Sequence, residues 1–400
     1  MNAAPPPDIL VLDHAAALAV NRRLYVALAQ RGLRIEVATA RSLWHLPGNR
    51  PAEPPAADDP PLHLLDFAGR NLRYPRIAGL AALLAARRPR LLHLNNEPDT
   101  PLAFRLAGRQ HARGGFLTAL SLESEFEPFW PALLGGHPRP AVRHLRTRLS
   151  ALATRRRIDH LFCHSRQIER AWQGLGFAGR TTVVPLGFEP ALFHPAADRR
   201  QATRARLGLT QCTIAYVGRM ARQKGVDLLV EALGQLAGRP WQLLMNRFLP
   251  DGTGYGEAVM ARLAALGLAE RVVVFQSSHA EVPDYLRAAD VVVVPSRWEE
   301  QYGRVAAEAM ACGTAVVVSR RGALPEIVGQ AGLIVPSDDA TALAAALAGL
   351  LDDPDRRQAL AAAGVARARQ VLSLESQADL MAAEFRRLLD GRRAIGPAPC

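Results

Sequence analysis

The chain has 400 residues, which is long for a single hydrophobic core and predicts two domains of roughly 200 residues each. Hydrophobic residues make up 49% and charged residues 22%, proportions typical of a folded globular protein, so extensive disorder is excluded. The net charge of +12 at pH 7 predicts an acidic partner, for which nucleic acid, anionic lipid and phosphorylated substrates all qualify.

The cysteine content and the hydropathy of the chain indicate in which cellular compartment the protein is expected. No run approaches the roughly 18 to 20 apolar residues that a membrane-spanning helix needs, and the first ten residues, MNAAPPPDIL, lack the pattern of a signal peptide. We therefore expect a cytoplasmic protein, either free or peripheral at the inner face of a membrane. Four cysteines without C-x-x-C spacing favour a reducing compartment and disfavour a structural zinc site: Cys163, Cys212, Cys312 and Cys400.

The first half of the chain alternates strands with helices, which predicts a parallel sheet with crossover helices. Residues 47–61, rich in proline, alanine and acid, are expected to form a loop, and residues 77–86 an alanine-rich helix. Residues 185–195 read as a linker to the second half. The expected strands cover residues 8–13, 34–39, 90–95, 115–120, 159–164 and 181–185.

Polar residues follow two of these strands. Asn95 and Glu97 come after one strand, and Ser121 and Glu123 after the next, so all four are candidates for a cleft beyond the carboxyl ends of the sheet. The alternative for the first pair is that they cap the following helix. The alternative for Glu123 is a solvated edge.

A basic segment follows at residues 139–157, with seven arginines and no acid. Val142, Leu145, Leu149 and Leu152 recur there at helical spacing, which predicts one apolar stripe among cations. Such a helix either lies on an anionic membrane surface or packs on its own sheet with solvated arginines outside.

The second half repeats the alternation, with a last helix that has no strand after it and is expected to cross back to the first half. Two doubly wound halves fit this pattern better than a barrel, because no eightfold count emerges. We expect domains at residues 1–190 and 191–373, with the crossing helix at residues 374–395. The expected strands cover residues 213–217, 242–245, 272–275, 291–294, 314–319 and 333–335.

The loop after the strand at residues 213–217 suits a diphosphate. It contains Gly218, Arg219, Lys224 and Gly225, with an arginine as a forked donor and a lysine as a point charge. Lys224 is the one lysine among the 49 lysine and arginine residues. This indicates a position that needs a compact ammonium group. The alternative is a surface position where lysine occurs by chance. The chain lacks a G-x-x-x-x-G-K-[ST] motif and a well-placed G-x-G-x-x-G motif, which disfavours P-loop hydrolysis and dinucleotide binding.

The stretch at residues 291–313, VVVVPSRWEEQYGRVAAEAMACG, predicts a buried strand, a polar loop and a helix at residues 304–311 that is stopped by Gly313. Glu300 lies in the loop and Glu308 in the helix. Backbone N–H groups that are free at a helix start bind anions, and carboxylates accept hydrogen bonds from the vicinal hydroxyls of a sugar or ribose. The stretch therefore predicts an anion and polyol site.

These motifs together resemble the donor domain of the retaining glycosyltransferases of family 4. The matching stretches are VGRMARQKGVDLLVEAL at residues 217–233, the Glu-x7-Glu element from Glu300 to Glu308, and GALPEIV with AGLIVP at residues 322–336. Looser echoes in the first half are LLHLNNEP and VVPLGFEPALFHP. The resemblance implies the α/β GT-B fold, two facing Rossmann-like doubly wound domains with a cleft between them, the first for the acceptor and the second for the donor.

The resemblance also implies roles for individual residues. Arg219 and Lys224 would hold the donor diphosphate, Glu300 the donor sugar and Glu308 the ribose hydroxyls. Further donor contacts would come from Gly218, Gln276, Tyr302, Gly303, Arg304 and Val305. Such enzymes retain anomeric configuration and use no metal or other cofactor. The donor would be a UDP- or GDP-linked hexose, and the acceptor a glycan, a lipid-linked molecule or a small molecule, with no nucleic acid partner.

The chain departs from the family pattern at several places. AAALAV at residues 15–20 replaces a glycine-rich loop, SLES at residues 121–124 replaces a segment that often contains histidine, and Asn246 and Ser277 stand where glycines are usual. Two other interpretations stay open: a sugar-nucleotide epimerase or hydrolase of the same fold, and a membrane- or polyanion-binding protein that has lost catalysis.

Overall fold

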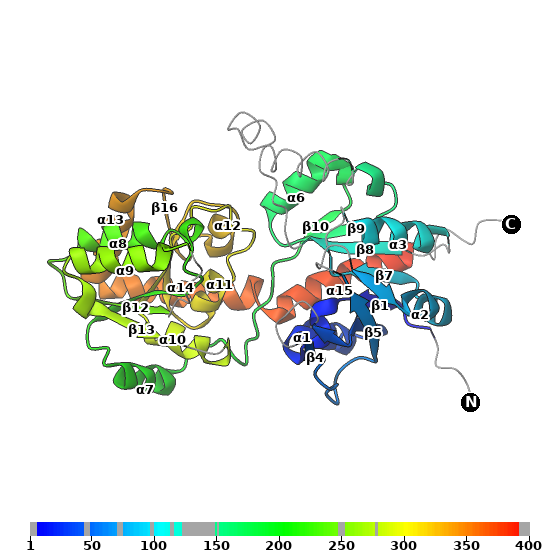
Figure 1. Cartoon of the computed structure of the whole chain (residues 1–400), viewed down its shortest axis with the longest axis horizontal. Helices are drawn as coiled ribbons and strands as arrows, with labels where there is room; N and C mark the ends of the chain where they lie inside the picture. Colours follow the sequence, from blue (N-terminus) through cyan, green and yellow to red (C-terminus); the bar gives the residue numbers. More distant parts are fainter. Residues whose placement is uncertain are drawn as a thin grey trace. The chain divides into compact units, whose positions relative to one another are not determined.

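The computed structural model describes residues 6–43, 49–69, 75–96, 100–112, 116–121, 149, 152–246, 253–276 and 279–391. The chain divides into two compact units, one formed by Met1–Pro185 with Gln377–Cys400 and the other by Leu186–Ser376 (Figure 1). Each unit is a sheet with helices on its faces. The division falls five residues before the boundary that we expected at residue 190.

The first unit contains an eight-stranded sheet in the order β10-β9-β8-β7-β1-β2-β5-β6. All pairings in it are parallel except that of β5 with β6. A separate short hairpin joins β3 (Ser42–Leu43) to β4 (Arg50–Pro51). The strands are β1 (Ile9–Leu12), β2 (Ile35–Ala40), β5 (Leu62–Ala68), β6 (Arg76–Ala78), β7 (Leu91–Leu94), β8 (Phe116–Ser121), β9 (His160–Cys163) and β10 (Thr181–Val183).

Two strands of the eight-stranded sheet were missed, as were β3 and β4, and β4 lies within the segment 47–61 that was expected to be a loop. The bounds expected for one helix were also wrong. β5 and β6 were not predicted, and the helix expected at residues 77–86 begins only at Leu80 because Ile77 and Ala78 belong to β6. β5 is exposed or half-buried along its whole length, so its sequence lacks the apolar run of a buried strand. The helical segments are η1 (His14–Ala17), α1 (Ala19–Gln30), α2 (Leu80–Arg87), α3 (Pro101–Ala112), α6 (Arg166–Trp172), η2 (Gln173–Phe177) and α15 (Leu374–Gly391).

α15 contributes to the core of the first unit. Its side chains Ala378, Met381 and Phe385 are buried in the same cluster as Val11 and Phe162, and Figure 1 shows the helix along the strands of that unit. The last helix thus belongs to the first unit from Gln377 onward. It ends at Gly391, and the rest of the expected span to residue 395 lies outside the described residues.

The second unit contains a six-stranded parallel sheet in the order β13-β12-β11-β14-β15-β16. These six strands are the six that the sequence predicted for this half, with ends that differ by at most one residue. They are β11 (Cys212–Tyr216), β12 (Trp241–Asn246), β13 (Val272–Phe275), β14 (Val291–Val294), β15 (Ala315–Ser319) and β16 (Leu333–Val335).

The helices of the second unit cover both faces of its sheet (Figure 1). Val292 of β14 faces one apolar cluster, while Val291 and Val293 face the other, as the twofold alternation of a strand requires. The helical segments are α7 (Ala197–Leu207), η3 (Arg222–Lys224), α8 (Val226–Gly234), α9 (Tyr255–Ala265), η4 (Ala269–Arg271), η5 (His279–Glu281), α10 (Val282–Ala288), α11 (Arg304–Ala311), α12 (Leu324–Val328), α13 (Ala340–Asp352) and α14 (Pro354–Val371).

The boundary between the units falls at the start of the linker expected at residues 185–195, but most of this segment belongs to the second unit. Phe188 and Phe193 are only 5% and 3% exposed, and both pack in a core cluster of the second unit. Phe188 also forms a parallel bridge with Ser373. The apolar aromatic residues in this segment therefore anchor it to the second unit.

No helix in the described part of the chain combines the length and the apolar character needed to cross a membrane.

Candidate functional site

The carboxyl ends of β11 and β14 bring two predicted site loops to one edge of the second sheet. The two strands are parallel neighbours, with Ile214 opposite Val291 and Ala215 opposite Val292. The chain leaves β11 into the loop that carries Arg219 and η3, and it leaves β14 into the loop that precedes α11. Ligands of open α/β sheets bind at this edge, where backbone groups are not used by the sheet.

The two loops are joined backbone to backbone. The N–H groups of Arg297 and Trp298 donate to the carbonyl of Gln223, at 2.9 and 3.1 Å. Gly225 has φ +67°, and a Cβ at this position would lie 2.0 Å from the carbonyl oxygen of Pro295. Both the left-handed backbone and the close approach require glycine, so Gly225 permits the contact between the loops.

Lys224 is held against the second loop by an ion pair. Its Nζ lies 2.6 Å from Oε1 of Glu300, and the hydroxyl of Ser296 donates to the same oxygen. The lysine and glutamate side chains are 23% and 12% exposed, so the pair is reachable from solvent but largely enclosed. Sequence reasoning had placed Lys224 and Glu300 at one site, and the structure brings them into contact.

Arg219 lies at the start of the same loop with an exposed side chain. This side chain makes no hydrogen bond or ion pair with the described residues, and its guanidinium is available to a ligand. Its backbone is fixed, because the buried phenol of Tyr216 donates to the Arg219 carbonyl at 2.6 Å. The N–H of Gly218 donates to Oδ1 of Asn246 at 2.8 Å, so the asparagine that replaces a usual glycine here holds the loop.

Glu308 is a buried acid on α11. It is 5% exposed, and its carboxylate makes no hydrogen bond or ion pair with the part of the chain that the structure describes. Burial raises the pKa of this carboxyl to about 7, against a smaller lowering effect of the Arg304 guanidinium. A buried acid without a partner is costly in a fold, which makes Glu308 a candidate for ligand contact.

The start of α11 offers backbone donors beside this acid. Gly303 precedes the helix with φ +87°, and a Cβ there would lie 2.4 Å from the Leu324 side chain. No side chain caps the helix, so the first N–H groups, those of Arg304 and Val305, are open to a ligand. Tyr302 turns away from this edge: its buried phenol donates to the Leu186 carbonyl at 2.5 Å, so it would contribute through its backbone.

A second layer of polar contacts supports the two loops. Arg297 pairs with Asp227 of α8 and with Asp338, in both cases at 2.5 Å, and the Tyr255 hydroxyl donates to Asp227 at 2.5 Å. Sequence reasoning missed these residues, although Asp227 stands three residues after Lys224 in the predicted motif. The network connects the loop after β14 to the first turn of α8.

Gly322 fixes the other side of the Glu300 loop. A Cβ at Gly322, whose φ is +58°, would lie 2.1 Å from the Glu300 carbonyl oxygen. That carbonyl accepts from Ala323 at 2.7 Å, and the Gly322 N–H donates to Glu299 at 2.8 Å. The glycine of the GALPEIV motif thus allows the chain to pass close to the loop.

Gln276 lies farther from these residues. It follows β13, which is separated from β11 by β12, so roughly 10 Å of sheet lies between the ends of β13 and β11. Its side chain is exposed, and its carbonyl accepts from the Tyr285 hydroxyl at 3.4 Å. Ser277 lies outside the described residues.

The acceptor-side candidates belong to the first unit. Asn95 follows β7, and Ser121 ends the neighbouring β8, so both stand at one edge of the sheet. Oδ1 of Asn95 is buried without a hydrogen-bond partner and the residue lines a small cavity of about 10 Å³ with His14 and Asn96. Glu97 and Glu123 lie outside the described residues, as does most of the basic segment at residues 139–157.

Residues 15–20, which depart from the glycine-rich loop of the family pattern, include the start of a helix. η1 and α1 occupy this segment, and the first N–H of α1, that of Ala19, donates to Oε2 of Glu53 at 2.7 Å. Buried Arg22 fastens the Glu53 segment through Asp59 and the Pro54 carbonyl, at 2.7 and 2.8 Å. The start of α1 is therefore occupied by a carboxylate of the chain itself.

Two family models match the chain. One, described as glycosyl transferases group 1, covers residues 211–353, and the other, a glycosyl transferase 4-like domain, covers residues 17–187. The lipopolysaccharide core biosynthesis mannosyltransferase LpsB of Rhizobium meliloti is 35% identical over 217 residues, which are 52% of this chain and 61% of that protein. A D-inositol 3-phosphate glycosyltransferase of Segniliparus rotundus is 37% identical over 216 residues, 52% of this chain and 47% of that protein. The chain thus spans about half the length of the curated relatives it matches.

Solved structures share the fold over nearly the whole chain. Sucrose-phosphate synthase of Thermosynechococcus elongatus is similar with a TM-score of 0.74 and 25% identity, covering 96% of this chain and 99% of that one. HepE of Anabaena, solved with UDP and glucose, is similar with a TM-score of 0.69 and 19% identity, covering 95% of this chain and 100% of that one. These likenesses define a protein of the GT-B class and confirm the expected fold. With both family models matched, the chain belongs to the GT-B glycosyltransferases of groups 1 and 4.

Proposed function

We propose that this chain is a retaining glycosyltransferase that moves a hexose-type sugar from a UDP- or GDP-linked donor to a glycan, lipid-linked or small-molecule acceptor. The observation that carries the proposal is the contact of Lys224 with Glu300 at 2.6 Å, formed where the ends of β11 and β14 meet. It places a cation suited to phosphate and an acid suited to sugar hydroxyls at one edge of one sheet.

The chemistry assigned to the cations is stabilisation of the leaving group. When the bond from the sugar to the nucleotide breaks, negative charge develops on the diphosphate. The Lys224 ammonium and the exposed Arg219 guanidinium are fixed positive charges that would stabilise it. In this proposal they do so without a metal ion or another cofactor.

Recognition of the donor is assigned to the Glu300 loop and α11. Glu308 would accept hydrogen bonds from the ribose hydroxyls, which would give its buried carboxylate partners. Glu300, already held by Ser296 and Lys224, would accept from hydroxyls of the donor sugar. The uncapped N–H groups of Arg304 and Val305 would add backbone donors.

The first unit is proposed to bind the acceptor, near Asn95 and the end of β8. The matched relatives are a mannosyltransferase of lipopolysaccharide core biosynthesis and glycosyltransferases of D-inositol 3-phosphate. Their names support a lipid-linked glycan or a small-molecule acceptor, and GDP-mannose belongs in any donor panel. Peripheral attachment to a membrane through residues 139–157 is part of the proposal for a lipid-linked acceptor.

A panel of nucleotide sugars tests the proposal, with binding followed by thermal shift and turnover followed by release of the nucleotide. We expect one donor to stabilise the chain, with stabilisation lost in Lys224→Ala and Glu308→Gln. If no nucleotide sugar binds, or if both variants bind as the parent does, the assigned site is wrong. Release of the nucleotide without any acceptor requirement would instead favour a hydrolase or epimerase of the same fold.

A further inference from the structure

The second unit contains a cavity of about 430 Å³ at the edge of its sheet opposite to the donor site. It lies beside Asp290, which comes directly before β14, whereas Pro295 on the donor side follows that strand. Five residues of extended chain separate the two points by roughly 16 Å. Among the residues that line it are Arg200, Arg287, Asp290, Cys312, Arg357 and Gln358.

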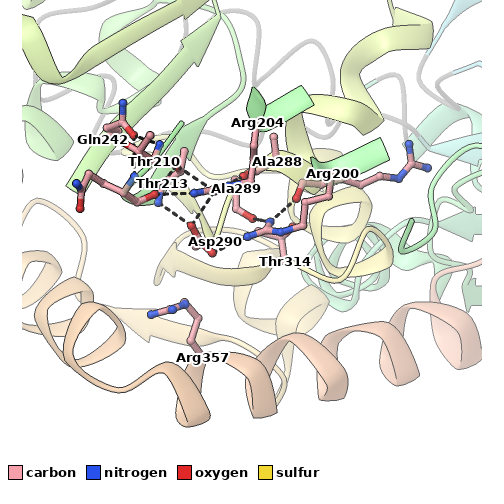
Figure 2. Close-up of polar contacts among 12 residues, drawn as sticks. Arg200, Arg204, Thr210, Thr213, Gln242, Ala288, Ala289, Asp290, Thr314 and Arg357 are labelled. Atoms are coloured by element: carbon pink, nitrogen blue, oxygen red, sulfur yellow. Dashed lines mark hydrogen bonds and ion pairs between the residues drawn. The ribbon is translucent and has the colours of Figure 1, made fainter. Parts of the chain in front are cut away.

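The single carboxylate of this lining is already bound by other groups of the chain. Asp290 accepts from Arg200 at 2.7 Å, from Arg204 at 3.1 Å and from the N–H of Thr213 at 2.7 Å (Figure 2). Two guanidinium groups thus share one acid, which leaves a net positive charge at this wall. The lining as a whole holds three guanidinium groups against one carboxylate.

Two of the arginines are rigidly placed. Arg287 is 5% exposed, donates to the carbonyls of His194 and Leu192 at 2.7 and 2.5 Å and pairs with Asp284 at 2.8 Å. Asp284 also pairs with Arg199, so this acid too is shared between two cations. Arg200 donates to the carbonyls of Arg287 and Ala289 in addition to its bond with Asp290. The orientation of these groups is set before any ligand arrives.

Arg357 differs from them in that most of its donors are unused. It lies on the first turns of α14 and donates through Nη1 to the Leu350 carbonyl, while its Nε and Nη2 make no hydrogen bond with the described residues. Figure 2 shows Arg357 across from the residues that contact Asp290, with no dashed line between Arg357 and those residues. A half-buried guanidinium with free donors facing a positively charged wall is suited to an anion between them.

The start of α7 adds a further favourable feature. Ala196 and Ala197 line the cavity, and Ala196 is an N-cap residue whose side chain cannot accept from the helix N–H groups. The neighbouring acids Asp198 and Asp355 are exposed and do not line the cavity. Free N–H groups at a helix start favour negative charge.

We propose that this cavity is a second binding site, for a small molecule that carries a phosphate group. A phosphate presents several acceptor oxygens, which suits guanidinium groups that converge from α7, α10 and α14. The volume is that of a small-molecule site and exceeds what a lone phosphate fills, so the ligand is a phosphate ester or a diphosphate. The site is separate from the donor site and does not depend on the proposed transferase activity.

Calorimetric titration of inorganic pyrophosphate into the full chain tests the proposal. The titration uses the Arg219→Ala and Lys224→Ala double variant, so that binding at the donor site does not contribute. Arg357→Ala is then added, with Arg356→Ala as the matched control because Arg356 is the exposed neighbour on α14 that does not line the cavity. Gln358→Glu is a second test, which adds a carboxylate to the lining without removing the bond from Arg357 to Leu350.

The expected result is saturable binding in the double variant that Arg357→Ala and Gln358→Glu each weaken by about tenfold to a hundredfold, while Arg356→Ala leaves it unchanged. Absence of binding in the double variant would overturn the proposal. Equal binding with and without the changes at residues 357 and 358 would overturn it as well.

Discussion

Lys224 and Glu300 lie 76 positions apart in the chain, yet Nζ of the lysine is 2.6 Å from Oε1 of the glutamate. The contact exists because β11 and β14 are adjacent in the sheet and because Gly225 lets the following loops approach. An ammonium is a compact charge that can contact both Glu300 and a phosphate. The arginine used almost everywhere else in this chain is larger and planar.

Replacement of Lys224 tests this reasoning. Lys224→Ala is expected to lower the rate of transfer by about 100- to 1000-fold, the usual effect of removing one preorganised group that stabilises developing charge. Lys224→Arg should restore less than a tenth of the lost rate, because a planar fork does not fit the same contact. Steady-state kinetics with the donor identified by the panel measures both.

The matched control is Arg222→Ala, which removes a cation two residues earlier whose side chain lies over the Tyr255 ring. It should change the rate by less than threefold, since a screened surface charge contributes little. A loss equal to that of Lys224→Ala would show that net charge, and not the position of Lys224, matters.

Gly225→Ala tests the contact between the loops. The added methyl would meet the Pro295 carbonyl at 2.0 Å, so we expect the free energy of unfolding to fall by about 3 kcal/mol or more. Gly208→Ala is the control, because Gly208 has a similar φ of +64° with nothing within 4 Å and should cost only about 1 to 2 kcal/mol. Urea unfolding of both variants gives the difference, and equal losses would contradict the assigned clash.

Glu308 predicts a pH dependence of stability. The pKa of this carboxyl is about 7 in the folded chain and near 4.5 in the unfolded chain. Between pH 4.5 and pH 7 the carboxyl is therefore protonated in the folded chain and ionised in the unfolded chain. The free energy of unfolding of the ligand-free chain should therefore decrease as the pH rises from 4.5 to 7, by roughly 3 kcal/mol at most. Glu308→Gln should remove this contribution, as measured by denaturant unfolding at several pH values.

The same group predicts how donor binding varies with pH. A ribose needs the ionised carboxylate as an acceptor, so the affinity should rise with pH up to about 7 and level off above it. Glu308→Gln should bind more weakly and lose most of this dependence. A parent affinity that is constant from pH 5.5 to 8 would contradict the role given to Glu308.

Arg297→Gln tests the support beneath the loops. The variant loses the ion pairs with Asp227 and Asp338, which are partly exposed and are expected to contribute less than about 1 kcal/mol each to stability. We expect a larger effect on the donor KM, which should rise several-fold because the loop after β14 is less well positioned. A loss of stability with an unchanged KM would show that the network is structural only.

The sequence predicted the donor side of the second unit well for a physical reason. β14 and α11 were expected at residues 291–294 and 304–311, and the structure has them there, because a β-branched run, a proline and a glycine set their limits locally. The family resemblance placed Lys224 and Glu300 at one donor site, but their direct contact was not predicted. These signals depend on short stretches of chain and on simple topology.

Other features depend on contacts that no short stretch records. β5 is half-exposed and is paired on one side by the antiparallel β6, so it lacks the apolar run by which β14 was found. Phe188 and Phe193 looked like part of a linker because their burial depends on the core of the second unit. The bond from Ala19 to Glu53 joins residues 34 positions apart and could not be inferred from either segment.

Binding of the donor to the Lys224 and Glu308 site is the central claim, and one titration tests it most directly. The nucleotide sugar chosen from the panel is titrated into the parent chain and into Lys224→Ala at pH 7.5. We predict saturable binding to the parent and an affinity at least tenfold weaker in the variant, with Arg222→Ala binding as the parent does. Equal affinities for the parent and Lys224→Ala would contradict the claim.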